Sequence, residues 1–285
     1  MKISKNKKTA EIVGLSLGDG SLTRRKNGKL RFQMRGNIKE DKEHYDLYVK
    51  PLFDKIIGKV FIVAYKGKKP SYGISSENQN NCNYLKFLGI PVGIKKEIVI
   101  PSWISSDREY LKGFLRGFID TDGSVFCGKD YNYPQKRHIK IRMSVCSTSH
   151  ILIKEINKSL LGLGIRNLII KPYKQKNNGW EDLNKIQIDG PNVVTYFELI
   201  GSKNQKHNTK FEIWRKFGFC PPYTSLEQRK NILDGNLDPH SFYISDNPPL
   251  KNAGMSESGQ KSTVEDKHQK PYALVAARVQ IPFPA

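Results

Sequence analysis

Residues 12–22 read Ile-Val-Gly-Leu-Ser-Leu-Gly-Asp-Gly-Ser-Leu, and residues 115–125 read Leu-Arg-Gly-Phe-Ile-Asp-Thr-Asp-Gly-Ser-Val. When the two stretches are superposed, an early Gly and a closing Asp-Gly-Ser coincide, with apolar residues at matching places. Asp122 follows Asp19 by 103 positions, which is too long for a solenoid repeat and suits a duplicated half-domain. The chain is therefore predicted to contain two related halves.

The segments that follow each copy also repeat. Each copy leads into a strand whose apolar and polar residues alternate, which predicts a sheet covered on one face and open on the other. Each half then reads as a helix, two further strands and a helix that ends at Gly89 or Gly201. The predicted strands are 30–35, 60–66 and 71–76, then 139–145, 168–173 and 185–189, and the predicted helices are 39–57 and 81–88, then 149–163 and 192–199.

This pattern predicts an α+β fold and a simple domain organisation. The first half is expected to span residues 1–104 and the second 105–224, joined by a linker at about 90–106 that contains two prolines. Residues 225–285 are expected to be a largely flexible extension, with a short docked helix and turn within 226–243.

Charge points to a polyanionic partner. The 285 residues carry 48 Lys and Arg against 27 Asp and Glu, a formal net charge of +21. Residues 225–285 are balanced, with seven basic and seven acidic side chains, so the excess lies on residues 1–224. Nucleic acid is the favoured partner. A membrane is disfavoured because no apolar run approaches the roughly 18 residues of a span and no basic amphipathic helix is evident.

Cysteine usage narrows the setting. The four cysteines are scattered and form no CxxC pair, which argues against a disulfide scaffold and against a zinc ribbon. An intracellular, reducing compartment is expected. The choice between an organelle matrix and a prokaryotic (archaeal) cytoplasm stays open.

Small residues recur on one face of each motif helix. The first helix is expected to run from Thr9, as N-cap, to about Asp19, which places Gly14 and Gly18 on one face; Gly117 and Thr121 are their counterparts. Each mid-helix Gly costs about 1 kcal/mol relative to Ala. Close approach of the two helix backbones would offset that cost, so the two helices are predicted to pack together.

Asp19 and Asp122 fall at the C-terminal ends of these helices, where the helix dipole already presents negative charge. Two carboxylates at this pole are unfavourable alone and become favourable with a bound cation. Mg²⁺ prefers carboxylate oxygens together with substrate phosphate oxygens. The pair therefore predicts metal-assisted phosphodiester hydrolysis.

The two stretches resemble the paired LAGLIDADG motifs of homing endonucleases, in the single-chain form that carries both copies, over about residues 9–217. The resemblance implies two pseudo-twofold αββαββα halves, with two central packed helices and a saddle of antiparallel sheets that binds DNA. It implies that Asp19 and Asp122 are the metal-binding acids, and Gly18 and Thr121 beside them are expected to belong to the metal site as well. The sixth motif position differs between copies, Leu17 and Asp120, and Asp120 is expected to play a structural or supporting role.

Further site residues follow from the resemblance. A lysine after the last helix of each half is expected near the metals; Lys95 and Lys203 are the candidates, with Lys96 and Lys206 as alternates. A polar residue near Gly36-Asn37 and near Cys146-Ser147 is expected to orient water.

The open sheet faces are expected to contact DNA, because Arg and Gln side chains pair well with purine edges in the major groove. Lysine- and arginine-rich loops are expected to contact phosphates. The candidate DNA-binding residues are Arg24, Arg25, Arg31, Gln33, Arg35, Lys66 and Tyr72 in the first half, and Lys140, Arg142, Ser144, Lys185 and Gln187 in the second.

The leading hypothesis is a monomeric, site-specific double-strand DNA endonuclease that uses Mg²⁺ or Mn²⁺ on an asymmetric target, with Ca²⁺ expected to bind without supporting cleavage. We expect an intron-encoded or free-standing reading frame; an intein is disfavoured because no protein-splicing signature flanks the motifs. The alternatives are an intron RNA maturase and a non-cutting DNA-binding regulator. The presence of both aspartates favours the nuclease.

Overall fold

The computed structural model describes residues 4–67, 70–95, 97–131, 137–173 and 183–243, which all fall within one compact unit, Met1–Lys251. The helices of these residues are too short or too polar to cross a membrane. The elements in chain order are α1 (Lys7–Gly18), β1 (Gly20–Arg24), β2 (Leu30–Asn37), α2 (Ile38–His44), η1 (Tyr45–Val49), α3 (Lys50–Ile56), β3 (Phe61–Tyr65), β4 (Ser71–Ser76), α4 (Gln79–Leu88), α5 (Ser102–Ser105), α6 (Arg108–Asp122), β5 (Gly123–Gly128), β6 (Lys140–Ser147), α7 (His150–Gly162), β7 (Leu168–Tyr173), β8 (Leu183–Asp189), α8 (Pro191–Leu199), α9 (Gln205–Phe217), α10 (Leu226–Leu233) and η2 (Pro239–Tyr243).

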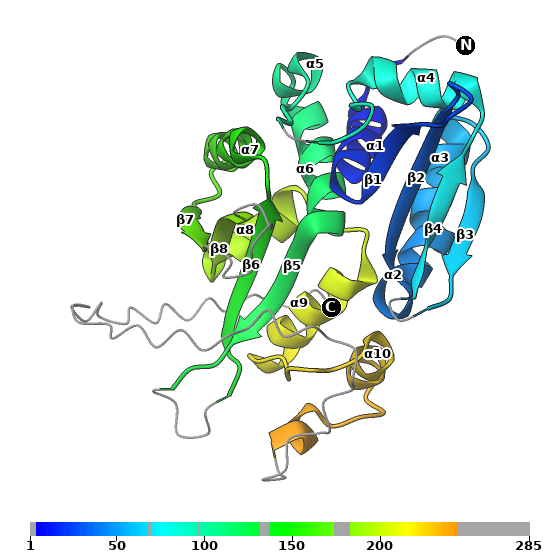
Figure 1. Ribbon diagram of the computed structural model, residues 1–285. Coiled ribbons are helices and arrows are strands. Elements are labelled where there is room, and N and C mark those ends of the chain that lie inside the picture. Colours follow the sequence, from blue (N-terminus) through cyan, green and yellow to red (C-terminus); the bar gives the residue numbers. More distant parts are fainter. Residues whose placement is uncertain (1–3, 68–69, 96, 132–136, 174–182, 244–285) are drawn as a thin grey trace, which may run out of the picture. The chain divides into compact units, whose positions relative to one another are not determined.

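Two four-stranded antiparallel sheets form the framework (Figure 1). Their strand orders are β1-β2-β4-β3 and β5-β6-β8-β7, so the second sheet repeats the first. The pairing of the first two strands also repeats, because Gly20 lies opposite Met34 in the first sheet and Gly123 opposite Val145 in the second. The predicted α+β fold class is confirmed.

Helices α1 and α6 pack against each other through glycines. A Cβ atom placed on Gly14 would lie 2.1 Å from the carbonyl oxygen of Phe114, and one on Gly117 would lie 2.2 Å from that of Glu11. Gly14 and Gly117 are equivalent positions of the two motifs, 103 residues apart, and so are Glu11 and Phe114. The two contacts are therefore equivalent and are related by a local twofold axis. The predicted close approach of the two helices is confirmed.

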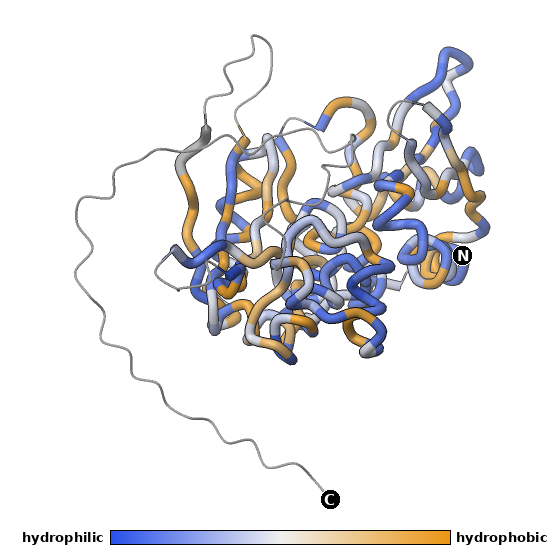
Figure 2. Tube along the Cα trace, turned by 90° about the horizontal axis from the view of Figure 1, so that it is seen from below, coloured by the Kyte–Doolittle hydropathy of each residue, from blue (hydrophilic) through white to orange (hydrophobic). Residues whose placement is uncertain are grey.

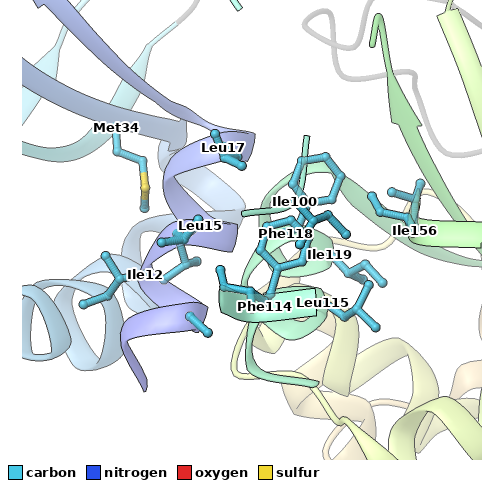
Figure 3. Close-up of a cluster of buried hydrophobic side chains, with 14 of the residues drawn as sticks. Ile12, Leu15, Leu17, Met34, Ile100, Phe114, Leu115, Phe118, Ile119 and Ile156 are labelled. Carbon is cyan, nitrogen blue, oxygen red and sulfur yellow. The ribbon is translucent and has the colours of Figure 1, made fainter. Parts of the chain in front are cut away.

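Hydrophobic side chains extend this contact into the core. Ile12 and Leu15 of α1 belong to the same buried cluster as Phe114 and Phe118 of α6 (Figure 3). All four side chains are at most 1% exposed. The helix pair is therefore a packed core element that fixes where its C-terminal ends lie.

Each sheet is apolar on its inner face, whereas its other face carries polar side chains on the central strands and exposed apolar side chains on the edge strands β3 and β7. In β2, Leu30, Phe32 and Met34 are buried while the residues between them reach solvent, and Ile141 and Met143 do the same in β6. The alternation of hydrophilic and hydrophobic residues is visible along the chain trace in Figure 2. Helices α2 and α4 contact the first sheet, and α7 and α8 contact the second.

The structure corrects two details of the predicted helices. Helix α1 begins at Lys7 and not near Thr9, because the Asn6 side chain accepts from the amides of Lys8 and Thr9 at 2.9 and 3.0 Å. The helix predicted over 39–57 contains a π-helical stretch, η1, before Pro51. Proline lacks an N–H and crowds the preceding turn, and this widening accommodates it.

The docked helix and turn expected within 226–243 are present as α10 and η2. The expected flexibility of residues 244–285 lies outside the described residues. The division into halves near residue 104 stays a prediction, since the described residues pack as one unit.

Candidate active site

The structure places Asp19 and Asp122 at neighbouring helix ends. Asp19 follows the last residue of α1, and Asp122 is the last residue of α6. A Cβ atom on Gly18 would lie 2.0 Å from Oγ1 of Thr121 and 2.2 Å from Oδ2 of Asp122. The small residue Gly18 thus lets the two acidic helix ends approach each other.

Both aspartates hold protons more tightly than usual. Burial, together with the negative charges of Asp122 and Asp41, raises the pKa of Asp19 to about 7, although Lys206 and Lys95 oppose the rise. The Asp122 side chain reaches solvent, but protein atoms crowd around its carboxyl group and raise its pKa to about 6. Burial therefore outweighs the nearby lysines at both carboxyl groups, and a bound cation would favour their charged forms.

Lys95 covers the C-terminal end of α1. Its Nζ donates to the carbonyl oxygens of Ser16, Leu17 and Gly18 at 3.1, 2.8 and 2.8 Å. These carbonyls are among those that a helix end leaves without intrahelical partners. Burial lowers the pKa of Lys95 to about 8, while the two aspartates act against this effect. Lys95 is thus a partly desolvated ammonium beside the aspartate pair.

The end of α6 is covered differently. Asn204 Nδ2 donates to the carbonyl oxygen of Asp120 at 3.0 Å, at the motif position of Leu17, whose carbonyl oxygen Lys95 contacts on α1. The Asp120 carboxylate accepts from Ser202 Oγ at 2.5 Å and from the Lys203 amide at 2.8 Å. Asp120 is buried and anchors the loop before α9, a geometry in line with the supporting role expected for it.

The two lysines considered for the second half lie in different places. The Nζ of Lys203 lies 5.9 Å from the centroid of the Tyr48 ring, and its charge is not among those that act on the aspartate pair. Lys206 lowers the pKa of both aspartates and forms an ion pair with Asp41 at 3.0 Å. The structure therefore brings the alternate, Lys206, to the site. Lys96 lies outside the described residues.

The donor set fits a hard divalent ion whose coordination is completed by substrate. Among the described residues, no group of three or more His, Cys, Asp or Glu side chains is arranged to hold a metal by itself. Two carboxylates with phosphate oxygens and water are a common Mg²⁺ environment. The Gly18 carbonyl already accepts from Lys95, and the Thr121 hydroxyl donates to the Phe118 carbonyl at 2.9 Å, so both candidates beside the acids have other partners.

On the open face of the first sheet, several polar side chains contact Tyr65. This tyrosine was not among the candidates predicted from the sequence. Its hydroxyl accepts from Gln33 Nε2 at 2.8 Å and from Arg31 Nη2 at 3.4 Å. Arg35 lies over its ring, 4.5 Å from the centroid. Three candidate DNA-binding side chains therefore share one tyrosine.

Other candidates of the first half lie around this face. Arg24 and Lys66 are exposed, and Arg25 pairs with Glu77 at 2.5 Å. Tyr72 does not share the face, because it is buried and donates to Asp46 Oδ1 at 2.5 Å on the helix side of the sheet. Residues of even and odd position in β4 point to opposite faces, and Tyr72 shares the side of the buried Ile74.

On the open face of the second sheet, the polar side chains contact an aspartate, Asp189, and not a tyrosine. Asp189 accepts from Gln187 Nε2 at 3.1 and 3.0 Å and pairs with Arg142 Nε at 3.1 Å. Lys185 lies 6.0 Å from the Phe126 ring centroid. Lys140 is exposed and pairs with Asp130 at 3.4 Å, whereas Ser144 is buried among its neighbours.

Two residues near the aspartate pair, Asp41 and Tyr45, were not predicted from the sequence. Burial raises the pKa of Tyr45, and the charges of the pair raise it further. Asp41 lies in α2, is 6% exposed and acts electrostatically on Asp19. The second half has no acidic residue at the position equivalent to Asp41, so comparison of the two halves did not point to Asp41. Tyr65 and Asp189 were missed for a related reason, since they act by holding other candidates.

Residues 109–206 match the family profile described as a LAGLIDADG-like domain. The replication factor C small subunit of Methanocaldococcus jannaschii is 27% identical over 209 residues, covering 70% of this chain and 11% of that protein. The chain therefore spans about a tenth of the length of this curated relative.

Two solved structures are similar at low identity. The homing endonuclease I-DmoI in complex with DNA and Ca is 14% identical, with 68% of this chain and 88% of that chain covered and a TM-score of 0.46. A lysine-to-alanine variant of I-SmaMI is 12% identical, with 74% and 90% covered and a TM-score of 0.48. Residues 109–206 are thus similar to a LAGLIDADG-like domain, which agrees with the resemblance seen in the motif copies.

Proposed function

We propose that this protein is a site-specific endonuclease that cuts both strands of duplex DNA with the help of divalent metal ions. The observation that carries the proposal is the meeting of Asp19 and Asp122 at two glycine-packed helix ends. A crowded acidic centre in a chain of net charge +21 is explained by cations and a polyanion that bind together. The LAGLIDADG-like domain at residues 109–206 supports the same assignment.

The residues of the site would have different roles in the cleavage reaction. Asp19 and Asp122 would hold Mg²⁺ or Mn²⁺ against the substrate phosphates. When bound, a divalent ion supplies Lewis-acid activation of the scissile phosphate and of the attacking water. Lys95 and Lys206 would place positive charge beside the developing negative charge of the phosphate, which a partly desolvated ammonium stabilises more strongly than one in water.

The two open sheet faces would bind the DNA on either side of this centre. The first face presents Arg31, Gln33 and Arg35 around a tyrosine, and the second presents Arg142 and Gln187 around an aspartate. Because these sets differ, they would read different base sequences, and the proposed target is asymmetric. One chain supplies both faces, so the proposed active species is a monomer.

A plasmid assay tests the proposal. The substrate is supercoiled plasmid carrying the DNA that flanks this gene, rejoined without the intervening element. We expect linear product with Mg²⁺ and none with EDTA. Asp19→Asn and Asp122→Asn should each abolish cutting while binding to the same DNA persists.

The alternatives give different outcomes in the same preparation. Binding of intron RNA without DNA cleavage in Mg²⁺ or Mn²⁺ would indicate a maturase. Tight, sequence-specific DNA binding without cleavage would indicate a regulator. Either result would overturn the nuclease proposal.

A further inference from the structure

We propose that Asp41 is a positioning residue that holds Lys206 beside the Asp19–Asp122 pair by linking the first half of the chain to the second. The inference rests on the proposed nuclease function and extends it to a residue outside both motifs. It follows from a set of buried contacts that meet at one carboxylate.

Asp41 is built into the first half at the junction of β2 and α2. Its Oδ2 accepts from the Asn37 amide at 2.9 Å, which fixes the carboxylate at the start of α2. A Cβ atom on Gly36 would lie 2.7 Å from this oxygen, so the absence of a side chain there makes room for the contact. The carboxylate is 8% exposed and has one defined orientation.

The other oxygen faces the second half. Oδ1 of Asp41 accepts from Asn204 Nδ2 at 2.9 Å and pairs with Lys206 Nζ at 3.0 Å. Asn204 is 1% exposed and also bonds the carbonyl of Asp120, two residues before Asp122. One carboxylate therefore connects α2, the start of α9 and the end of α6.

A carboxylate at the position of Asp41 is electrostatically unfavourable beside the aspartate pair. A residue that only linked the two halves would not have to be acidic. The negative charge of Asp41 adds to those of Asp19 and Asp122 at a site already crowded with carboxylates. Glu40, the preceding residue of α2, pairs with Arg229 of α10 at 2.5 Å, and Arg229 Nε donates to Thr209 of α9 at 2.9 Å, so Glu40 links α2 to the second half through the C-terminal extension. A link between the halves is thus available without an acid at the site, and the role left for Asp41 is to place Lys206.

The other lysine needs no such device. Lys95 Nζ is held by three backbone carbonyls of α1, and among the described residues it makes no ion pair with a carboxylate. Lys206 projects on a flexible stem from the first turn of α9, where Asp41 is the carboxylate that orients it. Loss of Asp41 should therefore affect one of the two lysines and leave the other in place.

Four variants test the inference: Asp41→Asn, Lys206→Met, the double variant, and Glu40→Gln as the matched control from the same helix. Cleavage is followed under single-turnover conditions on supercoiled plasmid carrying the rejoined flanking DNA, so that nicked and linear products are timed separately. Affinity for a linear duplex of the same DNA is measured in EDTA. Unfolding by urea is measured for all four without metal or DNA.

We expect Asp41→Asn to slow conversion of nicked to linear plasmid by about 10²-fold, the scale of a misplaced catalytic group, with affinity in EDTA changed less than about twofold. In the Lys206→Met background the same substitution should add little, because its target is gone. The unfolding data should show coupling between Asp41 and Lys206 in the absence of any activity. Glu40→Gln should lower stability without accumulation of nicked plasmid.

Additive effects of Asp41→Asn and Lys206→Met on the cleavage rate would overturn the inference, even if the wild-type protein cuts normally. An Asp41→Asn variant that loses only stability, as Glu40→Gln does, would overturn it too. A wild-type protein that binds the DNA and cuts neither strand would instead overturn the nuclease proposal, and this inference with it, while unfolding coupling would still report the ion pair.

Discussion

Gly18 faces the carboxyl group of Asp122 so closely that a Cβ atom on Gly18 would lie 2.2 Å from Oδ2. This relationship joins the packing of the helices to the chemistry at their ends. The glycine faces that allow α1 and α6 to approach also set how near the two acids lie. A change in the helix contact should therefore alter both stability and metal binding.

Substitution of Gly117 by Ala should destabilise the fold. The new Cβ would lie 2.2 Å from the Glu11 carbonyl, a backbone atom that cannot move alone, so a loss of about 1–3 kcal/mol in the free energy of unfolding is expected. Urea denaturation measures it. Gly162→Ala, at a helical position with no atom within 4 Å, is the control and should be neutral or stabilising by up to about 1 kcal/mol. Equal effects of the two substitutions would contradict the packing account.

The aspartate pair should make stability fall as pH rises. A carboxyl group whose folded pKa is raised binds its proton more tightly when folded, so its contribution is present at low pH. For Asp19 that contribution is lost between the ordinary value of 3.8 and about 7. In metal-free buffer, Asp19→Asn should therefore gain stability relative to wild type as pH increases from 4 to 7.5.

The same titration predicts the behaviour of the metal. Protons compete with Mg²⁺ for the two carboxylates, so stabilisation of the wild-type protein by Mg²⁺ should increase from pH 5.5 to 7.5 and vanish in Asp19→Asn. Thermal denaturation with and without Mg²⁺ measures both effects. Stabilisation by Mg²⁺ that does not change with pH would place the metal elsewhere.

Lys95→Met should reduce cleavage far more than Lys203→Met. Lys95 lies on the α1 carbonyls beside both aspartates, whereas the Lys203 side chain extends toward Tyr48. Loss of Lys95 should also cost about 1 kcal/mol of stability, because a cation at a helix C-terminus is removed. Single-turnover cleavage rates compare the two lysines, both of which the sequence named as candidates; a larger loss for Lys203→Met would contradict the placement of Lys203 away from the site.

Tyr65→Phe should relax base preference without abolishing DNA binding. The ring under Arg35 remains, but the hydroxyl that accepts from Gln33 is lost, so the amide is no longer held. Discrimination at the base pair read by Gln33 should fall about tenfold. Binding to targets randomised at each position measures this, with Tyr223→Phe, at a residue 79% exposed, as the control. An unchanged preference would mean that Tyr65 does not organise the face.

The sequence predicted the parts of this protein that obey a period or a repeat. The alternation of polar and apolar residues along β2 and β6 predicted the open sheet faces, and the two motif copies that end in Asp-Gly-Ser predicted the helix pair and its glycine contact. Helix ends were less certain, because Asn6 and Thr9 are both good N-caps and only the tertiary fold selects one.

The sequence did not predict the residues whose roles depend on contacts between distant segments of the chain. Asp41 and Lys206 are far apart in the chain, and nothing local in either segment shows that they pair. Tyr72 was assigned to the open face from its neighbourhood, yet the register of β4 places it on the buried side. Such details depend on how segments meet in space, which a pattern along one segment does not encode.

The most direct measurement is a crystal structure of the protein bound to its target DNA with Mn²⁺, with the metal located by anomalous scattering. The account predicts anomalous peaks between the carboxylates of Asp19 and Asp122 and the phosphates of the two strands, at about 2.1 Å from the carboxylate oxygens. Mn²⁺ bound away from both aspartates, or DNA seated away from the ends of α1 and α6, would contradict it.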